Sequence, residues 1–159
     1  MSVTVRPALP ADMDAVVELN GVVQSLHARL EPSVFRDSVD PAELRTFFSS
    51  VLISQDNYIL IAERSSEVVG YVWFDYQERP ESPFTHARTR IYIQHIVVGE
   101  TSRRLGVASA LLEAVEAEAR ARSVHRLVLD AWALNEEAQS FFKARDFRAF
   151  NIVLDKNFA

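Results

Sequence analysis

The chain has 159 residues, of which 48% are hydrophobic and 25% are charged, and this balance is typical of one folded domain rather than a disordered or membrane-spanning chain. Its net charge of −5 argues against general nucleic-acid binding, which needs a basic surface. Because the sequence has no cysteine, disulfides, thiolate metal sites and a cysteine nucleophile are excluded.

The N-terminal residues lack the basic start and apolar centre of a signal peptide. No apolar run approaches the roughly 18 residues that a membrane-spanning helix requires. We therefore expect a cytoplasmic protein, with residues 1–159 forming a single domain and with no membrane partner.

The first half of the chain begins with a predicted strand at Val3–Arg6 and continues into a helix with a spacing of three and four between apolar residues. This apolar stripe is expected to pack on a sheet and consists of Val16, Leu19, Val23, Leu26 and Leu30. The segment Glu31–Val39 has no clear period and is predicted to be a loop. A second helix is predicted after Asp40, which is an N-cap residue followed by proline and an acidic first turn.

The middle of the chain changes to the pattern of β-strands. Residues 58–63 and 68–76 are rich in β-branched and aromatic residues and are separated by a polar turn at Ser65 and Ser66, so they predict an antiparallel hairpin. The polar segment Gln77–Arg88 contains two prolines and is predicted to be a loop. We expect this loop to serve a peptide acceptor or a dimer contact.

A strand starting at Arg90 leads into a helix that reaches about Arg122, and the predicted first turn of this helix is basic. It carries Arg103, Arg104 and Gly106, although a helix N-terminus has a partial positive charge and favours acids. An anion between the arginines and the free backbone N–H groups would make this arrangement favourable. The sequence therefore predicts a phosphate or pyrophosphate site.

The last part of the chain continues with a strand at 125–132, a helix capped by Asn135 and a final strand at 147–156. A strand, helix and strand in this order form a right-handed crossover, so the strands at Arg90 and Leu127 are expected to be parallel neighbours. The whole order predicts an α+β fold, with a mixed, mainly antiparallel sheet and flanking helices.

Two motifs identify a family resemblance. The predicted phosphate site lacks the Lys-Ser/Thr of a P-loop and the glycine triplet of a dinucleotide fold. Residues 103–108, RRLGVA, resemble the Q/R-x-x-G-x-G/A signature of the GNAT superfamily of acyl-CoA-dependent N-acyltransferases. Residues 135–147 resemble the second motif of that family, N-x-x-A-x-x-F-Y-x-x-x-G-F. The hairpin around Gly70 and the opening at Arg6–Asp12 extend the resemblance over nearly the whole chain.

The resemblance implies a GNAT-like fold with acetyl-CoA, or a related thioester, between two separating parallel strands. The pyrophosphate is then expected on the N–H groups of residues 103–109 and the pantetheine arm along the strand before them, flanked by residues of the last helix. The implied cofactor contacts are Ile96, Val98, Arg103, Arg104, Leu105, Gly106, Val107, Ala108, Ser109, Asn135 and Phe142.

Two departures from the family pattern concern the turn after the second motif and the general acid. The family often has a tyrosine at the position of Phe142 as the acid for the departing thiolate, and phenylalanine has no proton to give. A thiol with a pKa near 8.5 is a fair leaving group without help, so we expect a small effect on rate. The glycine before the last phenylalanine of the motif is Asp146, which makes the turn there less regular.

The catalytic base is the open part of the interpretation. A primary amine with a pKa near 10.4 is mostly ammonium at pH 7, so a base or an ordered water is expected. Where many family members have an acid, this sequence has Gln94 and His95. His95 can accept a proton, whereas Gln94 can only orient a water or a substrate, and alternation puts the two on opposite faces unless a bulge intervenes. Tyr92 shares the face of Gln94 and is a candidate acid, or a packing residue.

The sequence supports two hypotheses for function. The first is direct transfer of an acetyl group from acetyl-CoA to a primary amine of a small molecule or peptide, in a ternary complex. The second is a CoA-binding sensor or interaction module that has lost catalysis. Candidates for acceptor specificity, or otherwise a solvated loop, are His27 near the end of the first helix and the residues after it, Arg29, Glu31, Pro32 and Phe35. Trp73, Tyr76 and Trp132 are expected in the core or lining the cleft. His86 and His125 lack metal-ligand spacing, so no metal is expected.

Overall fold

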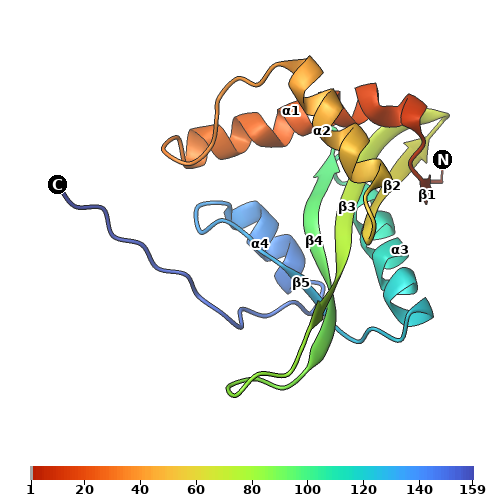
Figure 1. The fold of residues 1–159 in the computed structure, drawn as a ribbon. Helices are drawn as coiled ribbons and strands as arrows, with labels where there is room; N and C mark the ends of the chain where they lie inside the picture. Colours follow the sequence, from red (N-terminus) through yellow and green to blue (C-terminus); the bar gives the residue numbers. More distant parts are fainter. Residues whose placement is uncertain (1) are drawn as a thin grey trace.

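The computed structural model describes residues 2–159 and consists of one five-stranded sheet with helices on both faces (Figure 1). The strands are β1 (Thr4–Pro7), β2 (Asn57–Arg64), β3 (Glu67–Arg79), β4 (Arg88–Val98) and β5 (Leu127–Leu129). The helices are α1 (Met13–Leu30), α2 (Pro41–Ile53), α3 (Val107–Ala121) and α4 (Glu136–Lys143), with short 3-10 turns at Pro10–Asp12 and Glu100–Ser102.

The strands are ordered β1-β2-β3-β4-β5, and the pairs are antiparallel except for the parallel pair β4–β5. This confirms the predicted α+β class with a mixed, mainly antiparallel sheet. The parallel pair arises because α3 connects β4 to β5 by the crossover expected from the sequence.

Two apolar cores lie on opposite faces of the sheet. On one face, α3 packs through its buried residues Leu111, Leu112 and Val115. On the other face, α1 and α2 pack through residues that include Val16 and Phe48. Burial of these side chains contributes about 1.5–3 kcal/mol each, so the sheet is held between two hydrophobic layers.

Local capping sets the starts of the helices as the sequence predicts. The Asp40 carboxylate accepts a hydrogen bond from the N–H of Ala42 at the start of α2, and the Asn135 side chain accepts one from the N–H of Ala138 in α4. The opening motif is tied to the sheet by Arg6, which pairs with Asp12 and Glu63. This pairing holds the pKa of the Asp12 carboxyl below its usual value.

Two predicted boundaries are corrected by sheet pairing and backbone conformation. Residues Gln77 to Arg79 and Arg88 belong to strands, because backbone pairing continues along an exposed two-stranded ribbon despite the polar side chains. The ribbon projects beyond the sheet body in Figure 1. Helix α3 begins only at Val107, so the basic residues before it lie in a loop rather than in the first helical turn.

The predicted C-terminal strand at 147–156 is also wrong for the structure described here. Residues 148–159 are extended but pair with no strand in the described part of the chain. The predicted strand at 125–132 is likewise reduced to Leu127–Leu129. A strand pattern records side-chain preference, whereas a strand also needs a neighbouring backbone, and here the neighbour is absent from residues 2–159. Within the same range, no helix is long and apolar enough to cross a membrane.

Candidate cofactor and acyl-transfer site

The centre of the site is the place where the two parallel strands separate. Strand β5 pairs with β4 only at Ile91, Tyr92 and Ile93, while β3 continues to pair with β4 as far as Val98. Among residues 2–159, the side of β4 that would face β5 therefore has no strand partner after Ile93. An extended ligand with amide groups can hydrogen-bond to such a strand edge.

A cavity of about 350 Å³ adjoins this free part of β4. Its walls come from β4, from α1, from the loop before α3 and from α4, and they comprise Val22, Val23, Leu26, Ile96, Val97, Val98, Ser102, Arg103, Arg104, Gly106, Val107, Ala108, Ser109, Asn135, Glu137, Ala138, Phe141 and Phe142. Every cofactor contact implied by the sequence resemblance lies in this wall except Leu105, whose side chain is exposed to solvent.

The α1 wall of the cavity was missed from the sequence. The sequence predicts Val23 and Leu26 as core residues, because their helical spacing continues the stripe of Val16 and Leu19. Val16 and Leu19 are buried against the sheet, whereas Val23 and Leu26 are only partly buried and line the cavity. Periodicity identifies an apolar face but does not distinguish a core from a cavity wall.

The loop before α3 has the geometry of an anion site. Gly106 is the N-cap and adopts a left-handed conformation with φ 79°, as does Arg104 with φ 60°. The first hydrogen bond of the helix runs from the N–H of Ala110 to the carbonyl of Gly106, so the N–H groups of residues 107–109 are not used by the helix. These N–H groups and the helix dipole favour an anion at this position.

A third arginine borders the same position. The guanidinium of Arg145 donates a hydrogen bond to the hydroxyl of Ser109 and lies 5.3 Å from the ring centroid of Phe141. Arg103 and Arg104 also line the cavity, so three cationic side chains surround or border the helix start. The position of Arg145 follows from the turn after α4, where Asp146 adopts φ 64° in place of the family's glycine.

Helix α4 closes the opposite side of the cavity with aromatic side chains. Phe142 is buried and packs 5.3 Å from Phe141 and 5.4 Å from Phe147, measured between ring centroids. Its side chain has no ionisable group. The wall can therefore hold an apolar part of a ligand, while a proton for a leaving thiolate must come from elsewhere.

A β-bulge changes the expected arrangement of Gln94 and His95. Trp73 pairs with His95 and the next residue, Phe74, pairs with Ile93, so Gln94 is the extra residue of β4. Regular alternation would put Gln94 and His95 on opposite faces. Instead, Gln94 donates a hydrogen bond to Asp75, and His95 contacts Tyr71 and Trp73, which share the face of Asp75.

His95 is connected to α1 through a chain of hydrogen bonds. Its Nδ1 lies 3.1 Å from the Tyr71 hydroxyl, which accepts a hydrogen bond of 3.2 Å from the Asn20 side-chain amide. With Asn20 donating, the Tyr71 hydroxyl donates to Nδ1, and a neutral His95 carries its proton on Nε2. Burial, reinforced by His27, lowers the pKa of His95 to about 4, so the imidazole is neutral at pH 7. Asn20 and Tyr71 carried no signal of this role in the sequence.

Tyr92, the candidate acid, lies beside Asp75 and Asp130 and is hydrogen-bonded to Asp130. Its hydroxyl donates a hydrogen bond to the Asp130 carboxylate, and burial together with this carboxylate raises the pKa of the phenol. Asp75 accepts hydrogen bonds from Gln77 and Gln94. Tyr92 is therefore held as a donor to Asp130, and the two aspartates make this part of the sheet acidic.

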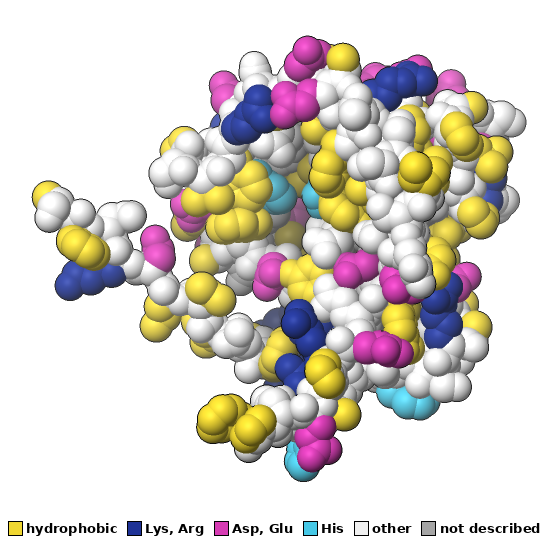
Figure 2. Space-filling model, in the orientation of Figure 1, with side chains coloured by type: hydrophobic (Ala, Val, Ile, Leu, Met, Phe, Trp, Pro, Cys, Tyr) yellow, Lys and Arg dark blue, Asp and Glu magenta, His cyan; other side chains and the backbone are white. Residues whose placement is uncertain are grey.

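An aromatic cluster joins two loops that are far apart in the sequence. The Phe35 ring lies 4.8 Å from His27 and 4.8 Å from Trp132, so the loop after α1 touches the loop before α4. Burial lowers the pKa of His27. Figure 2 shows a hollow on this side of the molecule with hydrophobic and histidine side chains along its walls.

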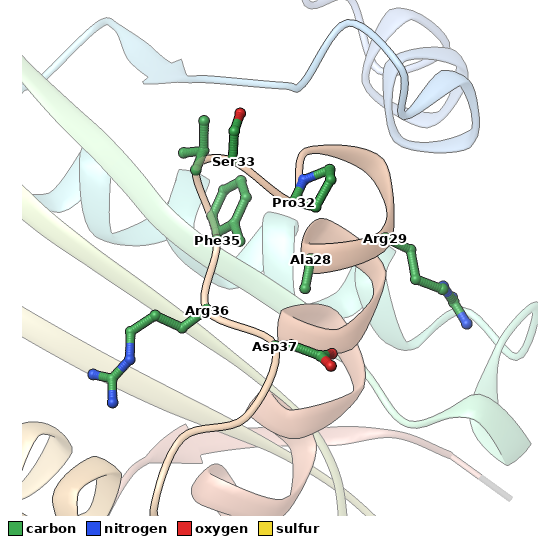
Figure 3. A pocket seen from close by; sticks show the side chains of 8 residues that line it. Ala28, Arg29, Pro32, Ser33, Phe35, Arg36 and Asp37 are labelled. Atoms are coloured by element: carbon green, nitrogen blue, oxygen red, sulfur yellow. The ribbon is translucent and has the colours of Figure 1, made fainter.

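The outer surface of the loop after α1 contains a second depression, of about 570 Å³. It is lined by Ala28, Arg29, Pro32, Ser33, Val34, Phe35, Arg36 and Asp37. In Figure 3, the side chains of Arg29 and Arg36 extend in opposite directions, and Arg36 pairs with Glu43. No element other than α1 and its following loop contributes, so we assign the depression to the loop surface rather than to the cofactor cavity.

Residues 2–159 contain no group of three or more His, Cys, Asp or Glu side chains arranged to hold a metal ion. The wall of the cavity offers backbone N–H groups and arginines, whereas the candidates Tyr92, Gln94 and His95 precede Ile96 on β4 and are not part of that wall. The wall can bind an anion and an extended ligand next to a group that exchanges protons.

Comparison with known proteins agrees with this geometry. Residues 23–147 match the family model described as the acetyltransferase (GNAT) family. No curated protein matches the chain by sequence. The fold is similar to a crystal structure of a mutant Bacillus halodurans protein, with a TM-score of 0.90 and 21% identity over 98% of this chain and 99% of the other.

Two further crystal structures share the fold. A predicted acetyltransferase from Clostridium acetobutylicum, solved with acetyl-CoA, has a TM-score of 0.70 and 20% identity over 98% of this chain and 96% of the other. An aminoglycoside acetyltransferase from an uncultured soil metagenomic sample has a TM-score of 0.69 and 21% identity, and the similarity covers 100% of both chains.

Proposed function

The chain belongs to the GNAT family of acetyltransferases, and from this premise we propose that it transfers the acetyl group of acetyl-CoA to a primary amine. The observation that carries the proposal is the cavity between the free part of β4 and the start of α3. It combines an unpaired strand edge with free N–H groups and arginines. The Clostridium acetobutylicum structure, which has the same fold and contains acetyl-CoA, supports this choice of co-substrate.

Two groups of cavity residues bind two different parts of the co-substrate. The N–H groups of residues 107–109, with Arg103 and Arg104, bind the pyrophosphate, because these donors are unused by the helix and lie at its positive end. The backbone of Ile96 and Val98 pairs with the amides of the pantetheine arm, while Asn135 and Phe142 flank it. This arrangement directs the thioester towards the Gln94 bulge.

The reaction is a direct displacement within a ternary complex. The amine nitrogen forms a bond to the carbonyl carbon of the thioester, the carbon–sulfur bond breaks, and the thiolate leaves with the electron pair. The amine loses one proton and the thiolate gains one, so the reaction needs a proton acceptor but no net acid or base. With no cysteine in the chain, a thiol-bound acyl-enzyme is excluded.

His95 is the proposed proton acceptor, directly or through a water that Gln94 orients. To accept at Nε2, the imidazole must carry its own proton on Nδ1 and donate it to the Tyr71 oxygen. Rotating the Asn20 amide permits this, since Tyr71 then donates to Asn20 Oδ1, an atom that has no partner among the described residues. In the opposite arrangement, Nε2–H can donate to the thioester oxygen and stabilise its developing negative charge.

The acceptor is proposed to be a cationic amine of a small molecule or peptide. Asp75 and Asp130 lie on or beside the face that carries His95, and carboxylates there favour a substrate with additional positive charge. The aromatic cluster of His27, Phe35 and Trp132 supports a wall against the apolar part of that substrate. The aminoglycoside acetyltransferase with this fold makes aminoglycosides one class to include in the test.

The test is an assay for free thiol with acetyl-CoA and a panel of amines. The panel pairs monoamines with diamines, aminoglycosides and lysine peptides of similar size, and mass spectrometry identifies the product. N-acetylation with a preference for polycationic acceptors supports the proposal. Calorimetry with CoA separates the alternatives, since tight CoA binding without turnover of any acceptor favours the CoA-binding module, and no CoA binding contradicts both.

A further inference from the structure

Two groups of charged side chains lie along one face of the sheet, beyond the part that α1 and α2 cover. Tyr71 and Trp73 belong to this face and contribute to the core under these helices. Alternation along β3 places Asp75, Gln77 and Arg79 on the same face. In Figure 1, α1 and α2 lie at one end of the sheet, and β3 and β4 continue beyond them into the ribbon. Asp75 and Gln77 are half-buried and Arg79 is exposed, so a ligand can reach this part of the face.

The first group is acidic and lies next to Gln94. Asp75 accepts hydrogen bonds of 2.9 Å from Gln94 and 2.8 Å from Gln77. Asp130 accepts a hydrogen bond from Tyr92, which pairs with Asp75 in the sheet, so the two carboxylates lie on opposite sides of β4. They favour a cationic group or hydrogen-bond donors of a ligand at this place.

The second group is basic and begins one pair further along the same strands. Gln77 pairs with Arg90, and the next pair on this face is Arg79 with Arg88. On the other side of β4, the register of β5 places Arg126 beside Arg90. Figure 2 shows basic side chains together below the hollow. The end of the face towards the ribbon is therefore positively charged, although the chain has a net charge of −5.

The four arginines of the basic group form no ion pair with a carboxylate among residues 2–159. Arg90 donates a hydrogen bond of 2.9 Å from Nε to the neutral side chain of Gln77. Burial, followed by the charges of Arg79, Arg88 and Arg126, lowers the pKa of Arg90. Like charges repel one another here, and an anion bound between the guanidinium groups would relieve this repulsion.

Strand geometry sets the distance from the reaction centre to the basic group. His95, the proposed proton acceptor, pairs with Trp73, and Arg90 pairs with Gln77, four residues further along β3. At about 3.3 Å per residue, the two pairs are roughly 13 Å apart. We propose, on the basis of the proposed acetyl transfer next to His95, that the acceptor also carries a carboxylate or phosphate group about 13 Å from its reacting nitrogen, and that Arg90 and Arg126 bind this anionic group.

The acceptor is then a dipolar amine. Its anionic group contacts Arg90 and Arg126, and its middle part passes Asp75 and Asp130, which bind a cationic group or N–H donors. An extended peptide covers about 13 Å with roughly four residues. A peptide with a free N-terminal amine and an acidic residue at its fourth position therefore fits both charged groups.

Peptides that differ at one position test this preference. The parent is the amidated peptide Ala-Arg-Ala-Glu-Ala, whose arginine supplies a positive charge without a second acceptor amine. Versions with phosphoserine, glutamine or lysine at the fourth position change the charge there. With acetyl-CoA, kcat/KM is expected to be about 10-fold higher for the glutamate peptide than for the glutamine peptide, and lowest for the lysine peptide. Comparison of the glutamate and phosphoserine peptides distinguishes a carboxylate from a phosphate.

Variants of two arginines connect the preference to the basic group. Arg90→Gln with Arg126→Gln is expected to remove the difference between the glutamate and glutamine peptides, and Arg90→Glu with Arg126→Glu is expected to reverse it in favour of lysine. The affinity for CoA is expected to stay unchanged in both, which separates a lost anion contact from a damaged fold. The control, Arg45→Gln with Arg120→Gln, removes the same charge from exposed arginines of α2 and α3 and is expected to keep the wild-type preference.

Calorimetry of peptide binding to the CoA complex gives a second measurement that needs no turnover. A lower Kd for the glutamate peptide that is lost in Arg90→Gln with Arg126→Gln supports the anion site even when no peptide is acetylated, and that outcome contradicts only the proposed function. Acetylation of all four peptides with equal kcat/KM and equal Kd overturns the anion site and leaves the proposed function standing. A preference for glutamate that persists in the double variant, or binding that does not depend on the charge at the fourth position, also overturns it.

Discussion

The hydroxyl of Tyr71 lies 3.1 Å from Nδ1 of His95 and joins the centre of the sheet to Asn20 of α1. Tyr71 is fully buried, and burial raises the pKa of its phenol, so the hydroxyl stays protonated and acts as a neutral link. Which nitrogen of His95 carries the proton is thus determined by a residue of another strand and an amide of a helix.

Tyr71→Phe is expected to lower kcat about 10–100-fold and leave the affinity for CoA unchanged, because His95 loses the partner that sets its tautomer. The unpaired Asn20 amide also costs about 1–3 kcal/mol of stability. Kinetics with a responsive amine measures kcat, the histidine ¹⁵N spectrum reports the tautomer of His95, and denaturant unfolding measures the stability. Tyr76→Phe on the same strand, which removes an exposed hydroxyl bonded to Glu78, is the control. An unchanged kcat and spectrum in Tyr71→Phe contradict the link.

Stability is expected to fall as the pH is lowered from about 6.5 towards 4. The folded pKa of His95, about 4, lies below its ordinary value of 6.5, so the unfolded chain binds more protons in this range. The contribution of this pKa difference to the free energy of unfolding is fully present above pH 6.5 and amounts to no more than about 3 kcal/mol. Urea unfolding at several pH values measures it.

Two variants separate His95 from the other groups that titrate nearby. In His95→Gln, the free energy of unfolding is expected to change less between pH 6.5 and 4 than in the wild type. His27→Gln removes the other histidine whose pKa burial lowers, and the slope from His95 should persist in it. Asp12 loses its ion pair only at lower pH, because its pKa is held below the ordinary carboxyl value. If the free energy of unfolding varies equally with pH in the wild type and in His95→Gln, the pH dependence does not come from His95.

Replacing the arginines at the start of α3 is expected to weaken CoA binding. Arg103→Glu removes a donor to the pyrophosphate and adds a repelling charge, and we expect the Kd to rise about 10–100-fold at low salt. Arg145→Gln is expected to raise it less, about 10-fold or below, because Arg145 reaches the site through Ser109. Arg120→Glu at the far end of the same helix is the control, and calorimetry gives the constants. Equal affinities in Arg103→Glu and Arg120→Glu would place the anion elsewhere.

Two glycine-to-alanine substitutions are expected to change stability in opposite directions. A Cβ at Gly70 would lie 2.8 Å from the carbonyl oxygen of Val97 and 3.0 Å from a methyl group of Val107, so Gly70→Ala must push β4 or α3 away and cost about 1–3 kcal/mol. Gly21 lies in α1 with no atom within 4 Å of the added group, and Gly21→Ala should stabilise by roughly 0.5–1 kcal/mol. Denaturant unfolding measures both, and equal signs would contradict the packing of α3 on β3.

The parts of the structure that sequence reasoning predicted are those that local interactions determine. Asp40 and Asn135 cap their own helices, and the strand, helix and strand around Gly106 determine a parallel pair through chain connectivity alone. The family motifs then indicated the wall of the cavity.

The missed features depend on residues that are distant in the sequence. Tyr71 meets Asn20 across 51 positions, and no pattern near either residue indicates the contact. Arg104 adopts a left-handed conformation that non-glycine residues rarely adopt, so no residue pattern indicates it, and helix α3 starts only at Val107. The C-terminal segment has the composition of a strand, but a strand forms only where a second backbone is available.

Because Gln94 is an extra residue in β4, odd-numbered residues face α3 before it and even-numbered residues face α3 after it. Ile91 and Ile93 face α3 before it, and Ile96 and Val98 face α3 after it, whereas Val97 faces α1 and α2. If β4 kept Gln94 but had no bulge, regular alternation after Ile93 would turn Val97 towards α3. The N–H and C=O groups on the cavity side of β4 would then belong to the other set of alternate residues. The single extra residue therefore determines the register in which an extended ligand can pair with this strand edge.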